Sequence, residues 1–215
     1  ERQAHTTTSG SPIIWSVLGR LNLTGAQMAG NVTLSGTLVL GGIDAAGIQV
    51  DGQFQLIPGE LLVKGDEPNE PSERDWYCRQ TLVKSWNDET AINMPSAQIK
   101  GDLYMSGVSL QGKLDLSNSS LGSTLVLTGY QLRTSKDPGY DVIIPSRIDG
   151  NLHLYLSEIK NATHFEGLQI SGSLAMWSMR SQAYVRLMPD GNLPCRIEGA
   201  IDLHSATMRQ FDLKG

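Results

Sequence analysis

The chain has 215 residues, 40% of them hydrophobic, and a formal net charge of −5 from 17 basic and 22 acidic side chains. This charge provides no basic stripe of the kind that attracts a phosphate backbone, so we expect no nucleic acid partner. No stretch approaches the roughly 18 to 20 apolar residues that span a bilayer, so we expect a soluble chain without a membrane span.

The chain begins with a polar stretch, residues 1–12, that is too polar for a signal-peptide core and that we interpret as an N-terminal tail. A short motif then recurs: an apolar residue, glycine two positions later, and apolar residues four and six positions later. Apolar residues at alternate positions predict strands, because the facing side of a helix needs a period of 3.6. The copies begin at Val17, Met28, Val39, Val50, Ile99, Leu110, Leu121, Ile148, Ile159, Ile170, Ile197 and Met208.

Within its runs the motif recurs with an 11-residue period, and its third slot is glycine except at Ser123, Asn161 and Gln210. A strand and a corner would use one such unit, and two units would form a coil of roughly 22 residues stacked about 4.8 Å from the next. The pattern therefore predicts an all-β fold, a parallel β-helix with two 11-residue units per coil, and we expect it to be right-handed. We interpret the glycine as a corner or close-approach residue, so Gly112→Leu should destabilise the fold more than a change at Gln111.

The motif loses phase after Leu56, and we predict a helix-bearing insertion over residues 66–91. Ser72 and Asp75 have the spacing of a capping box, and several large apolar residues that follow could share one face of a short helix. Aromatic side chains on such a face more often dock onto the solenoid wall than bind a ligand. The candidate binding residues in this insertion are Trp76, Tyr77 and Trp86.

A longer, 49-residue spacing separates Val50, Ile99, Ile148 and Ile197, and we interpret it as two coils. The extra residues before Ile148 and Ile197 each include a proline, which cannot donate to a strand ladder. We therefore expect one corner of alternate coils to be looped out.

Polar residues occupy the outward slot of many copies. They are Asn22, Thr33, Asp44, Tyr104, Asp115, His153, His164 and Asp202. On the 49-residue alignment Tyr104, His153 and Asp202 would share one column about 9.6 Å apart, and Asp115 would stand similarly from His164, too far for direct hydrogen bonds. Glycoside chemistry needs paired carboxylates within roughly 5 to 10 Å, so we expect no catalytic residues here and keep Tyr104, His153 and Asp202 as a candidate binding surface.

No metal or cofactor is expected. Cys78 and Cys195 are too few for a disulfide framework, and neither has a Cys or His partner at zinc-ligand spacing. No phosphate-binding loop, serine-hydrolase elbow or dinucleotide fingerprint occurs in the chain.

The Ile-x-Gly-x-Leu-x-Leu unit over residues 17–56 and 99–210 resembles the undecad repeats of large bacterial proteins. It is also distantly similar in logic to pentapeptide-repeat solenoids, from which it differs in its 11-residue period. The resemblance implies a non-enzymatic scaffold or interaction role. We expect a single β-helix domain over residues 1–215, part of a longer bacterial protein that is cytoplasmic or secreted.

Three functions are compatible with this pattern. The first is a non-catalytic β-solenoid module that presents a rigid wall and an inserted loop to a protein partner. The second is a carbohydrate-binding or carbohydrate-active β-helix, with a polysaccharide lyase or glycosidase as the enzymatic form. The third is a structural element that assembles end to end, because a solenoid end exposes unpaired backbone unless it is capped.

Overall fold

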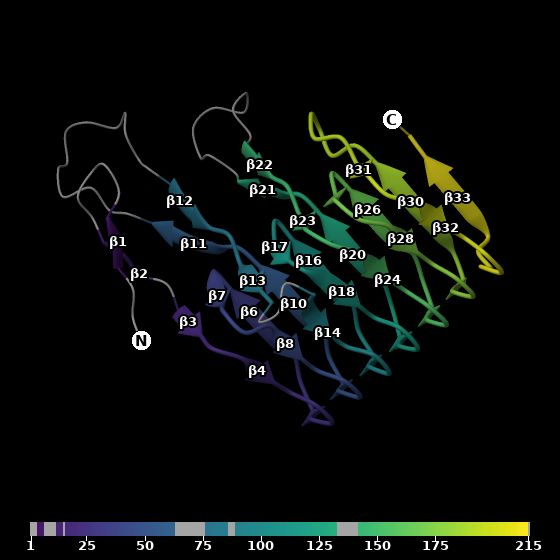
Figure 1. Cartoon of the computed structure of the whole chain (residues 1–215), viewed down its shortest axis with the longest axis horizontal. Coiled ribbons are helices and arrows are strands. Elements are labelled where there is room, and N and C mark those ends of the chain that lie inside the picture. Colours follow the sequence, from purple (N-terminus) through teal and green to yellow (C-terminus); the bar gives the residue numbers. More distant parts are fainter. Residues whose placement is uncertain are drawn as a thin grey trace.

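The structure is a computed structural model, and it describes residues 4–6, 12–14, 16–62, 76–85, 89–132 and 142–214. Its described part is all β, and its strands stack as a parallel β-helix whose coils run from the N-terminal to the C-terminal end (Figure 1). Four long parallel sheets form its sides, which we call walls 1 to 4 in the order in which the chain visits them. Three of these walls have 7 strands, which gives seven coils.

Each coil contributes one strand to each wall in turn, except that the seventh coil has only a single bridge in wall 3. Wall 1 contains β3 (Ser16–Leu18), β7 (Thr37–Val39), β13 (Leu82–Lys84), β17 (Ser109–Gln111), β23 (Arg147–Ile148), β27 (Gln169–Ile170) and β31 (Arg196–Ile197). Wall 2 contains β4 (Leu21–Asn22), β8 (Ile43–Asp44), β14 (Thr90–Asn93), β18 (Lys113–Asp115), β24 (Leu152–His153), β28 (Leu174–Ala175) and β32 (Ile201–Asp202). Wall 3 contains β5 (Gln27–Met28), β9 (Gln49–Val50), β15 (Gln98–Ile99), β19 (Ser120–Leu121), β25 (Glu158–Ile159) and β29 (Arg180–Ser181). Wall 4 contains β6 (Val32–Ser35), β10 (Phe54–Ile57), β16 (Leu103–Ser106), β20 (Leu125–Thr128), β26 (Thr163–Glu166), β30 (Tyr184–Met188) and β33 (Gln210–Leu213).

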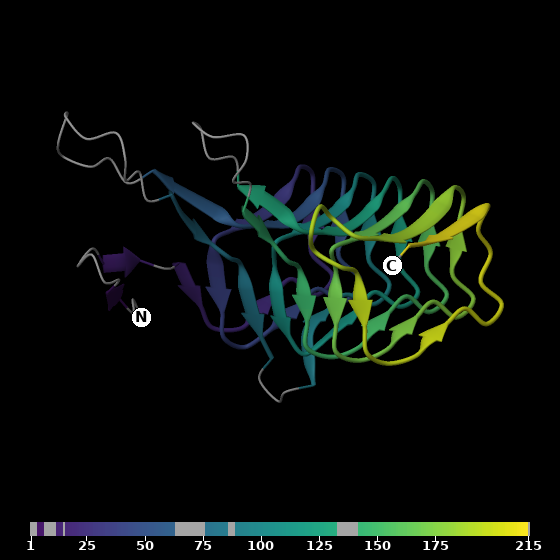
Figure 2. The same ribbon diagram turned by 90° about the horizontal axis from the view of Figure 1, so that it is seen from above.

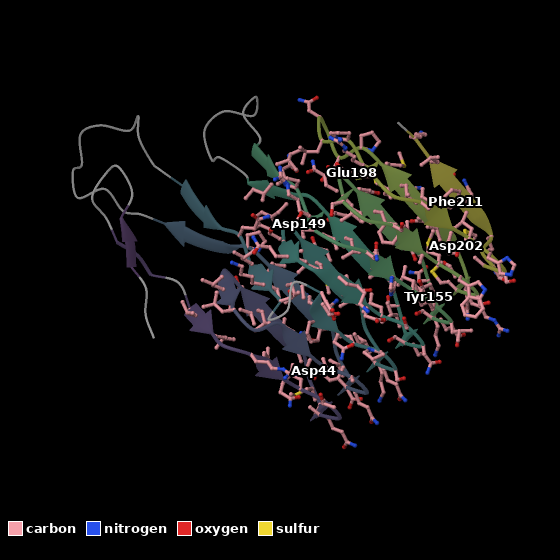
Figure 3. All side chains as sticks on the ribbon, in the orientation of Figure 1. Asp44, Asp149, Tyr155, Glu198, Asp202 and Phe211 are labelled. Atoms are coloured by element: carbon pink, nitrogen blue, oxygen red, sulfur yellow. The ribbon has the colours of Figure 1, made fainter. Side chains whose placement is uncertain are left out.

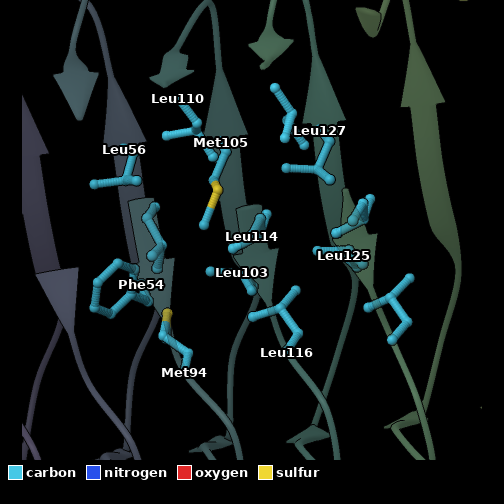
Figure 4. Packing of buried hydrophobic residues seen from close by; sticks show 14 of the residues in the cluster. Phe54, Leu56, Met94, Leu103, Met105, Leu110, Leu114, Leu116, Leu125 and Leu127 are labelled. Atoms are coloured by element: carbon cyan, nitrogen blue, oxygen red, sulfur yellow. The ribbon is translucent and has the colours of Figure 1, made fainter. Parts of the chain in front are cut away.

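Alternating apolar residues fill the interior because every strand directs them to the same side. Phe54, Leu103 and Leu125 lie in register on successive coils of wall 4, and all three side chains are fully buried (Figure 4). Burial of each such side chain contributes about 1.5 to 3 kcal/mol, so each inner coil is stabilised by the coils on both sides. In the first and last coils the inward residues, such as Met28 and Phe211, are only partly buried.

Glycine repeats at the corner between walls 1 and 2 because successive coils approach closely there. A Cβ on Gly150 would lie 2.8 Å from the backbone carbonyl carbon of Gly112 and 2.9 Å from the backbone nitrogen of Lys113. Gly112 itself has a φ of 133°, and a Cβ there would lie 2.8 Å from the nitrogen of Ala91. These contacts agree with the interpretation of the glycine slot as a close-approach position.

Insertions leave the stack at the corner between walls 4 and 1, after the second, fourth and sixth coils. The first is an antiparallel hairpin of β11 (Gly59–Leu62) and β12 (Trp76–Arg79), and the second pairs β21 (Tyr130–Leu132) with β22 (Val142–Ile144). The third is a short turn closed by a bridge between Asp190 and Leu193. Both hairpins project on the same side of the stack (Figure 2). This placement agrees with the expected loop-out at one corner of alternate coils.

The predicted helix in residues 66–91 is wrong in the part that the structure describes, because strands β12 and β13 lie there. β12 pairs with β11, whose residues lie outside the segment from which the helix was predicted. Val83 is fully buried in the wall and pairs with Leu110, so the stack has already resumed by β13. The polar tail also contains a strand, since β1 (Ala4–Thr6) pairs with β2 (Pro12–Ile14).

The 49-residue alignment is also wrong as a stacking register. Where nothing is inserted, neighbouring coils have a 22-residue offset, as between Phe54 and Val32. Val50 and Ile99 are direct neighbours on wall 3, and their 49-residue separation is one coil of 22 residues, 22 residues added before β13 and 5 more added between β13 and β14. On wall 1, by contrast, Ile148 and Ile197 are separated by the coil that carries Ile170. The same spacing therefore arises from two different paths, and the block that begins at Ile99 on wall 3 does not share a column with the block that begins at Ile148 on wall 1.

Candidate functional site

The outward polar residues predicted from the sequence divide between two walls. His153 and Asp202 lie on wall 2 with Ala175 between them, whereas Tyr104 lies on wall 4 between Gln55 and Val126. The expected shared column of Tyr104, His153 and Asp202 is therefore wrong for Tyr104. The error comes from the 49-residue alignment, which assigned strands of wall 2 and wall 4 to the same column.

Asp115 and His153 are direct neighbours on wall 2. His164, which was expected in the same column as Asp115, lies on wall 4 instead. The Ser117 hydroxyl donates to Asp115 at 2.6 Å, the Ser117 backbone N–H donates at 3.0 Å, and Lys113 Nζ lies 3.0 Å from the carboxylate. Partial burial acts to raise the pKa of Asp115, but these groups together hold the pKa below its usual value. Asp115 is thus an ionised carboxylate saturated by its own coil.

His153 packs on an aromatic neighbour. Its ring centroid lies 4.7 Å from that of Tyr155, and the Tyr155 ring meets Trp177 of the next coil edge-on at 6.2 Å. Burial and the nearby Lys113 ammonium lower the pKa of His153, which keeps the imidazole neutral near pH 7. The arrangement therefore gives an aromatic surface rather than an acid and base pair.

We call the region formed by Tyr155, Leu156 and Trp177 the corner surface, since it lies where wall 2 turns into wall 3. Leu156 is 56% exposed and Trp177 is 40% exposed, both high for large apolar side chains. Tyr155 lies at the edge of the stack in Figure 3, with Asp202 further along the same wall. Exposed apolar residues rimmed by polar groups are typical of interaction sites.

The backbone at this corner is unusual as well as exposed. Every coil has a residue with positive φ at this turn, and the series is Gly25, Gly47, Ser96, Asn118, Leu156, Ser178 and Ser205. Leu156, with a φ of 54°, is the one large apolar residue among them. The left-handed conformation costs roughly 1 to 2 kcal/mol for a residue with a Cβ, and such cost is often retained at functional sites.

A second polar cluster on wall 4 was not predicted beyond His164. Glu166 accepts from His164 Nδ1 at 3.2 Å, so His164 Nε2 can accept the Tyr184 phenol, also at 3.2 Å. The Arg186 guanidinium lies 4.7 Å from the Tyr184 ring centroid and 3.9 Å from Glu166. The 22-residue offset between His164 and Arg186 is the sequence signal that could have shown their adjacency.

This wall 4 cluster has the order of nucleophile, base and orienting carboxylate, but it lies on the face of a sheet. Arg186 also lies 3.8 Å from Asp212 of the last coil, so the cluster joins three successive coils. Its charges therefore pair mainly with one another. Close by, burial and then the Glu166 charge raise the pKa of Asp190.

The remaining candidate residues lie outside the site. Tyr77 and Trp76 belong to β12, but their side chains are outside the described residues, and so is Trp86. Burial raises the pKa of the Cys195 thiol to about 11, which leaves it protonated.

Comparison with known proteins gives no family: no family model, curated protein or solved structure matches this chain. Among the described residues, no three His, Cys, Asp or Glu side chains gather as metal ligands would. The described part of the chain also has no helix with the length and apolar character that a membrane crossing requires. A function for the protein therefore has to be argued from its own surface.

Proposed function

We propose that the protein is a non-catalytic β-solenoid module that binds a protein partner on the corner surface. The observation that carries this proposal is the exposed Leu156, held in a left-handed conformation beside the half-buried Tyr155 and the exposed Trp177. Tyr and Trp are enriched at the energetic centres of protein interfaces. His153 and Asp202 would form part of the polar rim around this apolar centre.

The rigidity of the surface supports the same role. Leu156 donates its backbone N–H to Trp177 at 3.0 Å, and Tyr155 accepts from the Asn118 N–H at 2.6 Å. The corner is thus tied to the coils on both sides, and little conformational entropy is lost when a partner docks. The polar groups nearest to it, such as Asp115, are already paired within the protein, which favours binding over catalysis.

Several finer expectations belong to this proposal. We propose that each coil is two 11-residue units, that the β-helix is right-handed, and that it forms a single-domain module of a longer bacterial protein related to undecad-repeat solenoids. The insertion between β11 and β12 is proposed as a second contact for the partner, through residues such as Trp76 and Tyr77. Trp86 and Tyr104 remain candidates of the same kind.

The proposal is tested by quantitative capture from lysate of the source organism with matched variants. Leu156→Asn and Trp177→Ala remove apolar area at the corner surface. Leu40→Asn is the control, because Leu40 is 42% exposed on the second coil, away from this corner. We expect a partner that is lost with Leu156→Asn and Trp177→Ala and retained with Leu40→Asn.

Two results would contradict this placement. Equal capture of the partner by all variants would show that the corner surface does not bind it. Loss only when residues 63–75 are replaced by a short glycine and serine linker would assign binding to the insertion instead.

Two alternatives are each favoured by one observation. The Tyr155 and Trp177 rings could stack on sugars, and a glycan array that detects binding lost in Trp177→Ala would favour a carbohydrate-binding module. The partly buried inward residues of the first and last coils, such as Met28 and Phe211, favour end-to-end assembly. Mass that rises with concentration in light scattering would support it, and a monomer at high concentration would contradict it.

A further inference from the structure

Wall 3 is positively charged although the chain as a whole has a net charge of −5. Four of its outward residues are basic and two are acidic, which gives a balance of +2. They are Lys100, Lys160, Arg180 and Arg209, with Arg209 toward the corner with wall 4, against Asp51 and Glu158. Basic side chains therefore outnumber acidic ones on this wall, opposite to the sign of the whole chain.

The same wall is hollowed. A depression of about 510 Å³ is lined by Lys100 and Lys160, with Gly122 between them on the intervening coil. It is larger than the depressions of about 300 Å³ on wall 2 and 140 Å³ on wall 1. A Cβ on Gly122 would overlap the Lys100 backbone, so coil packing itself keeps this position empty of a side chain.

The two lysines are not equivalent. Lys100 Nζ lies 2.7 Å from Asp51, which partly neutralises it. Within the described residues Lys160 forms no ion pair. The lysines are anchored two coils apart, which is about 9.6 Å along the stack. One net positive charge therefore faces the hollow, with a second cation available if Asp51 is displaced.

Five of the other lining residues have neutral hydrogen-bonding side chains. They are Gln49, Ser96, Gln98, Asn118 and Ser120. Amides and hydroxyls both donate and accept, which suits a ligand rich in hydroxyl groups. The surface thus combines widely spaced cations with a polar, uncharged floor.

We propose that wall 3 binds an acidic polysaccharide, with a carboxylate or sulfate of the polymer held between Lys100 and Lys160 and its sugar hydroxyls bonded to the amides and hydroxyls of the hollow. One cation per two coils fits a polymer whose charges are separated by neutral units. A nucleic acid strand carries one charge per about 3.4 Å, which these lysines would leave mostly uncompensated. The outward residues of wall 3 in the described coils also include no aromatic platform for bases. This site adjoins the corner surface, since Ser96 and Asn118 of the same turn line the hollow, but it uses different side chains and does not rest on the proposed function.

The test is isothermal titration calorimetry of the whole chain with hyaluronan oligosaccharides, in which every second sugar carries a carboxylate, at low and at high salt. Neutral dextran, a thymidine oligonucleotide and polyglutamate are the comparison ligands. Lys160→Gln is the main variant, and Lys84→Gln on wall 1 is its matched control, because it makes the same charge change on another exposed lysine. Asp51→Asn frees Lys100, with Asp149→Asn on wall 1 as its control.

We expect the hyaluronan oligosaccharides to bind and dextran not to bind, with affinity that falls as salt rises. Lys160→Gln should weaken binding by up to about fivefold, the range of one exposed ion pair, and Asp51→Asn should strengthen it by a similar factor. Lys84→Gln and Asp149→Asn should change it little. Thermal melts by circular dichroism confirm that each variant is folded.

Three results would overturn the proposal. The first is absence of binding of the hyaluronan oligosaccharides. The second is an equal effect of Lys84→Gln and Lys160→Gln, which would indicate unspecific charge attraction. The third is tighter binding of the oligonucleotide or of polyglutamate, which would assign the wall to a different class of polymer.

Discussion

The glycine corner between walls 1 and 2 allows a direct test of how the coils are stacked. Gly150 and Gly19 occupy the same slot of the same corner, but a Cβ on Gly150 would meet the backbone of the coil beneath, whereas a Cβ on Gly19 would have nothing within 4 Å. Neither glycine has a positive φ that alanine would resist. Alanine at the two positions therefore differs only in the presence of a neighbouring coil.

The magnitude follows from the contacts. The Cβ of Gly150→Ala would approach two backbone atoms of Gly112 and Lys113 at 2.8 and 2.9 Å, and both belong to a hydrogen-bonded ladder that cannot move alone. Overpacking of this kind costs about 1 to 3 kcal/mol, while restriction of the unfolded chain returns about 0.4 to 1 kcal/mol. The central values leave a net cost of about 1.3 kcal/mol. With about 2 to 4 °C per kcal/mol for a chain of this size, Gly150→Ala should lower Tm by roughly 3 to 5 °C.

Gly19→Ala should instead raise Tm by roughly 1 to 4 °C, because only the effect on the unfolded chain remains. Thermal melts followed by circular dichroism, with urea unfolding as a second measure, check both values. Equal destabilisation by the two variants, or no loss of Tm in Gly150→Ala, would refute the close coil approach on which this reasoning rests.

Three further predictions concern single side chains. Leu156→Asn should raise Tm by roughly 2 to 4 °C, because asparagine tolerates the left-handed conformation that costs leucine about 1 kcal/mol; an unchanged or lower Tm would contradict that cost. Burial and Lys113 lower the pKa of His153, so below the ordinary pKa of 6.5 the unfolded chain binds the proton more readily than the folded chain. The free energy of unfolding should therefore fall as pH drops from 7 to 5, and His153→Gln should reduce this slope, as measured by urea unfolding. An equal slope in the variant would exclude His153 as its source. In a Cys78→Ser background at pH 8, Cys195 should react with an aryl disulfide about tenfold more slowly in the folded protein than in urea. A pKa of about 11 removes most of the thiolate, and the greater nucleophilicity of the remaining thiolate offsets only part of that loss. Equal rates would show that the thiol is not buried.

The strand pattern could be predicted because it is local. Alternating apolar residues such as Leu114 and Leu116 identify the inward face, and both are fully buried. The glycine slot could be interpreted correctly for a similar reason, since a missing side chain at the same position in most copies of the repeat implies a close approach there.

The register could not be predicted, because it depends on how many residues leave the stack at each insertion. Val50 and Ile99 are separated by one coil and Ile148 and Ile197 by two, although both pairs have the same separation in sequence. This ambiguity placed Tyr104 in one column with His153, which lies on another wall. Pairing of β12 with β11 was hidden for the same reason, since a partner outside the local segment decides between strand and helix.

The corner surface was only partly visible in the sequence. His153 and Asp202 were found as outward residues, but Tyr155, Leu156 and Trp177 lie at the end of the strand slot, where the repeat gives no rule for exposure. Their importance comes from the positive φ of Leu156, which the backbone reveals and the composition does not.

The corner between walls 4 and 1 also makes the protein suitable for engineering. Insertions of very different length, residues 59–80 and 190–195, leave there without disturbing the ladders on either side. Because they leave after every second coil, peptides grafted at these positions would be held at intervals of about 9.6 Å along one edge. Such fixed spacing would give grafted ligands a defined effective concentration for a multivalent receptor.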